Sequence, residues 1–451
     1  MGLGTGLGTG LASGLISGLT LAAPAARAQG SQDGRALAQA LAAAGPGDVV
    51  EVTGTQVLDA PLRVRSGIRL TGAPGARLIA GRAMETLVRI MPGSSGAGIE
   101  GLVLDGAGLT GSLINATGAS DCSITACRGV RWRGGIVAGA LGETAARGVR
   151  IARVTLETPA PGAVVPMLVR SGIGGPLVRD VVLEDIRVTG VGGSYSRTNS
   201  ATADQVVLQG VRGFRLSRIE STRGGENGIT VGRLSGEGLI EDCLVAACDG
   251  HGLNVGSGYV AVTVEGGAGL AEGMVLRGPG RLRAGLQRRR GQILFLNRIV
   301  RGRLAPGDIL RAAEDADADT GLSTSPDSLT QDSAVRDSLA RDSLARDSLA
   351  TVTAVERSGA IRVRGVTARA NWQNRAGVRG QGAGLYVQQA DRVFFERCRS
   401  GSDAADRPGT QDWGLLFAQS DVGWQDCDLS GNQRGESRAT GASRTLPFEP
   451  G

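Results

Sequence analysis

The sequence contains no lysine and a single histidine, His251, in 451 residues. All 49 basic residues are therefore arginine, which excludes any mechanism that needs a lysine amine. We interpret this usage as a bias in codon composition, whereas an anionic partner would show as a clustered stripe of arginines. The net charge of +6 therefore does not identify a partner by itself.

Aromatic residues make up only 3% of the chain, and no run approaches 18 apolar residues. The lack of such a run argues against a membrane-spanning helix. Few rings and 74 glycines instead suit a coil with many tight turns and an aliphatic core, while 41% hydrophobic residues are too many for wholesale disorder. A stacked coil also accommodates the length, because each repeat packs only on its neighbours.

The first 28 residues have the features of an export signal, although a basic segment is missing. The stretch from Leu11 to Pro24 is apolar and small, and Ala26-Arg-Ala28 has the form of a signal-peptidase site. We therefore expect the mature protein to be periplasmic or secreted, where disulfides can form.

Two patterns recur along the chain. The unit Gly-Ile229-Thr-Val231 returns 24 residues later as Gly-Leu253-Asn-Val255. A second pattern runs apolar, any, apolar, any, any, then apolar or cysteine. It occurs nine times, with copies that begin at Ala97, Cys122, Val149, Val181, Phe214, Gly238, Ile361, Val393 and Val422. Self-similarity of this kind is typical of stacked-repeat architectures.

The spacing of these patterns predicts three short strands per turn of a coil. Alternation at period two indicates strands with one buried face, and the two-residue break indicates a bend between strands. Before the repeats, residues 33–44 have Ala and Leu at helical spacing and end at Gly45-Pro46, which predicts a short helix that caps the stack. Strands are expected at residues 49–52, 62–64 and 68–70.

This pattern, with its helical cap and the segment AAAGPGDVVEV, resembles the right-handed parallel β-helix proteins of the pectate-lyase-like superfamily. The resemblance covers roughly residues 33–257 and 358–432. It implies an all-β solenoid and a carbohydrate-facing protein, because members include pectate lyases, polygalacturonases, mannuronan epimerases and phage tailspikes.

We divide the chain into five segments. Residues 258–357 form an insert, β-rich to about residue 312 and followed at 313–350 by a low-complexity linker with Asp-Ser-Leu every five residues. In the insert, Arg288-Arg-Arg290 is interpreted as a solvated face, with polyanion binding as the alternative. The other segments are the signal (1–28), the capped first part of the coil (29–257), the last rungs (358–432) and a disordered tail (433–451).

Aligning the repeats places four of the six cysteines in one column, which predicts small buried thiols at this position. The four are Cys127, Cys243, Cys398 and Cys427. Cys398 and Cys427 fall in successive repeats, about 4.8 Å apart, so a disulfide between them is geometrically allowed. Packed free thiols are the alternative, and the sequence leaves the choice open.

The same alignment gathers polar residues on one outer face, where a β-helix forms its binding groove. Carboxylates, amides and aromatic rings on such a face suit sugar recognition, and a histidine or a carboxylate can move a proton. The predicted catalytic residues are Asp204, Glu226, Asp249 and His251. The predicted substrate-binding residues are Arg223, Asn227, Arg233, Asn254, Tyr386 and Trp413.

One motif around the histidine has a more specific resemblance. Gly-His251-Gly resembles the motif of polygalacturonases, which implies that His251 assists inverting hydrolysis between carboxyls about 6.5 to 9.5 Å apart. The sequence departs from that family: Glu226-Asn227 stands where an Asp-Asp pair is expected, and the Arg-Ile-Lys motif is absent. The alternatives are a polar residue in a Gly-x-Gly turn, and lyase or epimerase chemistry with Arg223, Arg233 and His251.

We therefore expect an exported protein that binds a polysaccharide or cell-surface glycan, with hydrolase or lyase/epimerase activity as the enzymatic form. The competing hypothesis is a non-catalytic surface or tail-fibre-like module in which the insert is the interaction domain. No cofactor is expected, with Ca²⁺ as the alternative, although no clustered Asp set offers a clear site for it. No nucleic acid partner is expected, and the sequence does not give the oligomeric state.

Overall fold

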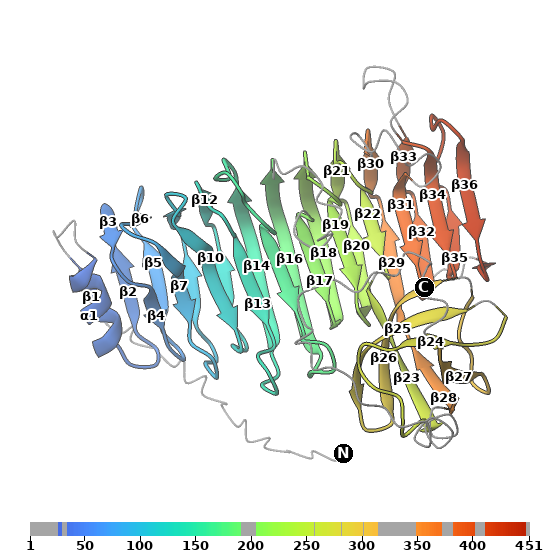
Figure 1. The fold of residues 1–451 in the computed structure, drawn as a ribbon. Helices are drawn as coiled ribbons and strands as arrows, with labels where there is room; N and C mark the ends of the chain where they lie inside the picture. The colour runs from blue at the N-terminus through green and yellow to red at the C-terminus, as the bar shows by residue number, and fades with distance from the viewer. Residues whose placement is uncertain are drawn as a thin grey trace, which may run out of the picture.

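The chain folds into a long coil of parallel strands with a small barrel at its side (Figure 1). The computed structural model describes residues 26–28, 34–190, 204–256, 258–280, 282–300, 302–313, 349–371, 382–401 and 411–447. The predicted all-β solenoid with one N-terminal helix is confirmed as a parallel β-helix, since every strand pair in the coil is parallel. No helix of the described residues is long and apolar enough to cross a membrane.

The coil has three faces, each built from one strand per turn. The first face contains β1 (Ala26–Ala28), β2 (Val49–Val52), β5 (Arg69–Gly72), β8 (Gly98–Glu100), β11 (Ser123–Thr125), β14 (Arg147–Leu156), β16 (Val178–Thr189), β18 (Val211–Thr222), β20 (Gly236–Glu241), β29 (Ser358–Arg364), β32 (Ala390–Glu396), β35 (Asp421–Gln425) and β37 (Arg444–Thr445).

The second face continues the first after a bend, and β14, β16 and β18 run through both. Its other strands are β3 (Thr55–Leu58), β6 (Arg77–Ala80), β9 (Val103–Asp105), β12 (Arg128–Val130), β21 (Leu244–Ala246), β30 (Thr367–Arg369) and β33 (Arg399–Gly401). The third face contains β4 (Leu62–Val64), β7 (Met84–Ile90), β10 (Thr110–Thr117), β13 (Ile136–Gly139), β15 (Met167–Arg170), β17 (Val206–Gln209), β19 (Ile229–Gly232), β22 (Leu253–Val255), β31 (Ala383–Gln388), β34 (Trp413–Ala418) and β36 (Gly435–Thr440).

The bend between the first two faces is one residue in the left-handed conformation in all nine copies of the repeat. Its φ is +53° at Ala126, +52° at Arg218 and +53° at Asp242, and the position is glycine in two copies. A left-handed residue turns the chain without a loop, so the two-residue break in the pattern is the bend that the sequence predicts.

The core is a set of aliphatic columns that run along the coil axis. On the third face, one column joins five fully buried residues in register: Val206, Ile229, Leu253, Leu385 and Leu415. The helix α1 (Arg35–Ala43) closes the N-terminal end by burying Leu37 and Leu41. Arg65 donates to the carbonyls of Ala42 and Ala44 and so satisfies the last turn of this helix.

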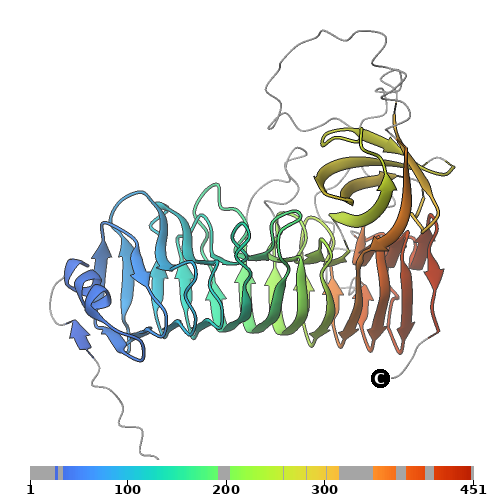
Figure 2. The same cartoon turned by 90° about the horizontal axis from the view of Figure 1, so that it is seen from below.

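The insert is a closed six-stranded antiparallel barrel with its own core (Figure 2). Its strands are β23 (Tyr259–Gly266), β24 (Val275–Arg277), β25 (Arg283–Arg290), β26 (Ile293–Val300), β27 (Ile309–Ala312) and β28 (Ala350–Glu356). β28 follows the Asp-Ser-Leu stretch and closes the barrel, so Ala350 belongs to the barrel rather than to the linker. Most of that stretch lies outside the described residues.

The coil continues across the insert without a change of register. Leu253 of β22 pairs with Leu385 of β31, although 132 positions separate them in the sequence. Charged contacts hold the barrel against the coil: Arg212 binds Glu356, and Arg303 binds Asp391 and Asp421. The arginines at 288 and 290, predicted to form a solvated face, donate to the carbonyls of Ile173 and Gly174 on the coil.

The C-terminal segment differs from its prediction, and the predicted N-terminal signal is only partly described. Residues 433–447 do not form a disordered tail, because β36 pairs with β34 and β37 pairs with β35 to add a further rung. The pattern gave no sign of this rung since β36 is largely exposed, and its backbone pairing rather than apolar burial holds it. Of the predicted signal, residues 1–25 lie outside the described residues, and β1 pairs with β2.

Candidate functional site

Three predicted site residues form a hydrogen-bonded ladder along the coil axis. Asn227 N–H donates to Asp204 Oδ1 at 3.0 Å, His251 N–H donates to Asn227 Oδ1 at 2.8 Å, and Ala383 N–H donates to His251 Nδ1 at 3.3 Å. Each of these residues stands two positions before the buried aliphatic residue of its own strand. The side chain on one rung therefore satisfies the backbone amide of the next.

The turns that hold the ladder residues require glycine directly before the strands β19 and β22. A Cβ at Gly228 would lie 2.0 Å from Val245 Cγ1, and one at Gly252 would lie 2.6 Å from the carbonyl oxygen of Gly384. The rungs approach so closely here that only glycine fits between them. The Gly-Ile/Leu-x-Val units in the sequence reflect this packing.

Asp204 is saturated by donors on the neighbouring rung. Its Oδ1 also accepts from Asn227 Nδ2 at 2.8 Å, and its Oδ2 accepts from Thr230 Oγ1 at 2.8 Å. The carboxyl is 5% exposed. A buried carboxyl that accepts from three donors is held in one position, which suits an orienting role.

His251 and Tyr386 lie face to face on the outside of the third face. Their ring centroids are 4.1 Å apart and the planes differ by 14°. Because His251 Nδ1 accepts from the backbone of Ala383, the neutral ring carries its proton on Nε2. Burial raises the pKa of Tyr386 to about 12, so its phenol remains a hydrogen-bond donor throughout the physiological range.

Asn254 stands next to His251 and Tyr386, and its side-chain amide oxygen is unsatisfied. It lies between Thr230 and Tyr386 in the register of the third face and is only 7% exposed. Its Oδ1 is buried and has no hydrogen-bond partner among the described residues. Buried polar atoms are almost always paired in folded proteins, so an unpaired oxygen at this position is unusual.

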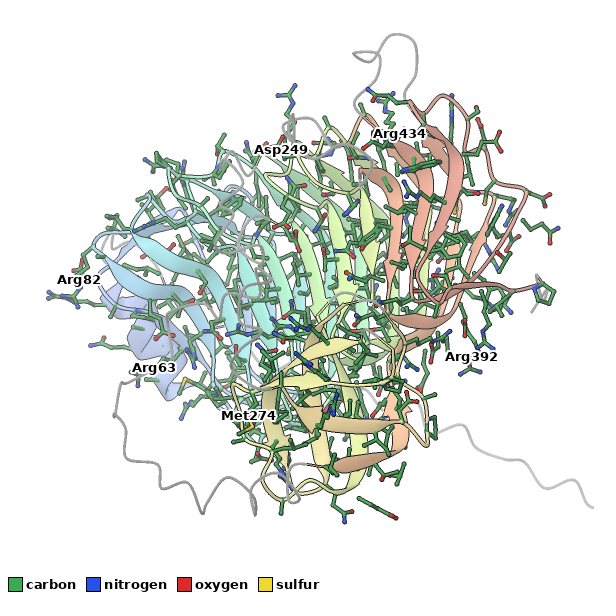
Figure 3. The ribbon with its side chains drawn as sticks, turned by 45° about the vertical axis from the view of Figure 1, so that its right-hand side comes forward. Arg63, Arg82, Asp249, Met274, Arg392 and Arg434 are labelled. Atoms are coloured by element: carbon green, nitrogen blue, oxygen red, sulfur yellow. The ribbon has the colours of Figure 1, made fainter. Side chains whose placement is uncertain are left out.

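The other predicted acids, Glu226 and Asp249, are less closely joined to Asn254, His251 and Tyr386. Glu226 is buried, and its carbonyl accepts from Gly250 N–H at 2.7 Å. Asp249 is half-buried, on the rim of the coil away from the barrel (Figure 3). Asp204, Glu226 and Asp249 do occupy successive rungs, but they stand two, three and four positions before the buried strand residue. The acids are therefore staggered rather than stacked in one column.

The two predicted arginines do not belong to this cluster. Arg223 is exposed. Arg233 lies at the opposite end of β19, over the Tyr259 ring of the barrel at 5.9 Å. Burial lowers the pKa of Arg233, since its guanidinium is enclosed between the coil and the barrel. The structure thus assigns Arg233 to the junction with the barrel and not to the face with His251.

Trp413 takes part in a contact that the sequence did not predict. Arg438 of β36 lies over its ring at 5.5 Å, and Arg434 donates to Asp412 at 3.2 Å. Both arginines fall in the segment expected to be a tail, and Arg434 lies on the same rim as Asp249 (Figure 3). Only the register of the last rung shows these contacts, so no sequence signal could have found them.

We looked for a metal site among the side chains that the structure describes. No group of three or more His, Cys, Asp or Glu residues there lies close enough to hold a metal ion. The side chains at Asn254, Tyr386 and His251 supply an amide, a phenol and an imidazole next to the buried carboxyls of Asp204 and Glu226.

Solved structures with a similar fold include enzymes and a phage protein. The A-module of mannuronan C-5 epimerase AlgE6 from Azotobacter vinelandii is 11% identical, matches 91% of this chain and 93% of its own, and has a TM-score of 0.43. The polygalacturonase of Erwinia carotovora ssp. carotovora is 9% identical over 94% of this chain and 96% of its own, with a TM-score of 0.46.

The Dettilon tailspike protein (gp208) is 12% identical, and the match spans 90% of this chain but 64% of the tailspike, with a TM-score of 0.48. No family model and no curated protein matches the sequence. The polygalacturonase and the epimerase are of classes to which the sequence resemblance pointed.

Proposed function

We propose that this chain is an exported β-helix protein that binds a polysaccharide on the outside of its third face, around Asn254 and Tyr386. The observation that carries the proposal is the buried Asn254 amide oxygen without a described partner, next to the stacked rings of His251 and Tyr386. A sugar offers hydroxyl donors and an apolar ring face, which match an amide oxygen and an aromatic side chain.

The distribution of charge favours the third face over the first. On the first face, arginines pair with carboxylates between neighbouring rungs, as in Arg69–Glu100, Arg150–Glu184 and Arg215–Glu241, at 2.8, 2.8 and 2.5 Å. Within each of these pairs the opposite charges neutralise each other. On the third face, Thr230, Asn254 and Tyr386 form a neutral polar column that suits hydroxyl groups.

The state of Asp204 supports binding rather than hydrolysis as the primary role. Inverting hydrolysis needs one carboxyl that gives up a proton and another that activates water. Asp204 accepts three hydrogen bonds within the fold, so it is not placed to give up a proton or to activate water. The adhesive or tail-fibre-like form of the hypothesis is consistent with this arrangement, and the barrel then adds a second interaction surface.

One observation favours an enzymatic form in which His251 donates a hydrogen bond to the substrate. The backbone of Ala383 fixes the tautomer of His251 and leaves the proton on Nε2. A neutral imidazole N–H is a weaker acid than an imidazolium, so it polarises or hydrogen-bonds a substrate oxygen more readily than it protonates one. Turnover would then depend on His251 and on a base such as Glu226 or Asp249.

A panel of uronic-acid and neutral polysaccharides separates these forms. Affinity electrophoresis of the wild type detects binding, and release of reducing ends or unsaturated products detects turnover. Binding without products supports the non-catalytic form. Products that disappear in His251→Ala support the enzymatic form, and the absence of both binding and products from the whole panel contradicts the proposal.

Export forms part of the proposal and rests on residues 1–28. Expression of the full chain in a bacterial host, followed by fractionation and N-terminal sequencing, tests it directly. A mature protein that begins at Gln29 in the periplasm or medium is expected. A cytoplasmic protein that retains its first residues would contradict export without affecting the glycan-binding test.

A further inference from the structure

The cysteine column on the coil contains one place where two thiols are direct neighbours. Backbone bonds between rungs set the order of the column: Cys127 follows Leu102, Val366 follows Cys243, Cys398 follows Val366, and Cys427 follows Cys398. Cys127 and Cys243 therefore have aliphatic neighbours. Only Cys398 and Cys427 stand on consecutive rungs.

The backbone holds these two residues in register. Asp428 N–H donates to the carbonyl of Cys398 at 2.9 Å, and Cys398 N–H donates to Cys427 Sγ at 3.4 Å. The second contact shows that the Cys427 sulfur points back toward the rung of Cys398. Parallel strands are about 4.8 Å apart, and disulfides join Cα atoms 4.4 to 6.8 Å apart, so the strand spacing suits a bridge. The Cys398 thiol lies near the carbonyls of Val363 and Glu396, and it turns toward Cys427 Sγ when the bridge forms.

The two thiols also differ in reactivity from the others in the column. The contact with the Cys398 thiol lowers the pKa of Cys427 below its usual value, while the same contact and burial raise the pKa of Cys398. Cys427 is half-buried. Burial alone raises the pKa of Cys127 to about 11 and that of Cys243 to about 12. Because Cys398 is buried, Cys427 is the thiol of the pair that a small oxidant reaches first.

We propose that Cys398 and Cys427 form a disulfide that fastens two of the last rungs of the coil to each other. The oxidant is a low-molecular-weight disulfide such as oxidised glutathione. The Cys427 thiolate attacks one of its sulfurs, releases one thiolate and forms a mixed disulfide. Cys398 then attacks Cys427 Sγ, its proton passes to solvent, and the second thiol of the oxidant leaves. The protein loses two hydrogens, and the oxidant is reduced to two thiols.

The bridge would act where the coil is least supported. The N-terminal end is closed by α1, whereas the rung beyond Cys427 consists of the largely exposed β36 and the two-residue β37. A covalent link between residues 398 and 427 removes conformations from the unfolded state and so raises stability. Thus the disulfide would compensate for the lack of an apolar cap in the described C-terminal residues.

The test compares the full-length wild type with Cys427→Ser and with Cys243→Ser, which removes a thiol from the same column. Each protein is treated with oxidised glutathione, and with dithiothreitol as the reduced reference. It is then denatured, alkylated and analysed by intact mass and peptide mapping. The expected result is one 398–427 bridge, with a mass lower by about 2 Da before alkylation, in the wild type and in Cys243→Ser but not in Cys427→Ser.

The melting temperature of the oxidised wild type is expected to exceed that of the reduced protein by a few degrees, and Cys427→Ser should show no such difference. Six alkylated thiols in the oxidised wild type, or a bridge between other cysteines, would overturn the proposal. Peptide mapping of the wild type decides the bridge even if Cys427→Ser fails to fold. A bridge with an unchanged melting temperature would overturn the stabilising role.

Discussion

The imidazole of His251 lies flat on the phenol ring of Tyr386, with the ring centroids 4.1 Å apart. The two residues are separated by the whole insert in the sequence but by a single rung in the coil. The barrel therefore leaves the outer face intact on both sides of its insertion point. The continuous register of the third face brings the residues that we propose for glycan binding together.

Asn227 is predicted to stabilise the fold by joining two rungs. In Asn227→Ala, Asp204 loses one donor and the buried amide of His251 loses its acceptor. We expect the free energy of unfolding in urea to fall by about 3 kcal/mol, because buried polar groups left unpaired are costly. The control is Asn115→Ala, which breaks only a local bond to Thr117 N–H and should cost about 1 kcal/mol or less. Equal losses in the two variants would contradict the ladder.

Gly228 is predicted to tolerate no side chain, although its φ is not positive. A methyl group there would collide with Val245, so Gly228→Ala should lower the free energy of unfolding by about 2 kcal/mol. Gly172→Ala is the matched control, because nothing lies within 4 Å of a Cβ at that position. Thermal unfolding of both variants tests the prediction, and a neutral Gly228→Ala would show that the rungs can move apart.

Asp421 should make the junction between barrel and coil sensitive to acid. Burial opposes its ionisation, but hydrogen bonds from Arg303 and Arg444 prevail and hold the pKa of Asp421 well below its usual value. A carboxyl whose pKa is lower in the folded than in the unfolded state stabilises the fold above about pH 4, the ordinary aspartate pKa. That stabilisation is lost as the pH falls further.

We therefore expect Asp421→Asn to be less stable than the wild type at neutral pH by about 2 kcal/mol, since Arg444 loses its carboxylate and Arg303 keeps only Asp391. The difference should shrink as urea unfolding is repeated below about pH 4. Asp426→Asn, an exposed change on the same rung, is expected to behave like the wild type at every pH. A gap between Asp421→Asn and the wild type that does not change with pH would show that the carboxylate charge has no such role.

The coil could be predicted from the sequence because every turn of the coil has the same physical requirements. A bend that needs one left-handed residue and a core that needs three apolar positions leave the same pattern nine times, as at Ile240-Glu-Asp242-Cys243. The last rung leaves no such trace, since Arg438 and its neighbours on β36 are exposed and are held by backbone pairing. Apolar alternation cannot indicate a strand that buries little.

The site was predicted in part. The alignment placed Asn227 and His251 in one column, and the structure adds Asp204 to it. That their side chains bond along the axis follows from the spacing of the rungs, which the sequence does not specify. The stack of His251 on Tyr386 crosses the insert, and the place of Arg233 under the barrel depends on where that barrel docks. Both are tertiary relationships with no local pattern.

The most direct test of the account is the affinity of the third face for a polysaccharide identified from the panel. Isothermal titration would compare the wild type with Tyr386→Ala, with Asn254→Ala, and with Val137→Ala, which alters the same outer column on β13. We expect each of the first two variants to lose about tenfold in affinity, or about 1.4 kcal/mol, and Val137→Ala to bind as the wild type does. Unchanged affinity in both Tyr386→Ala and Asn254→Ala, with the fold intact, would contradict the proposed binding face.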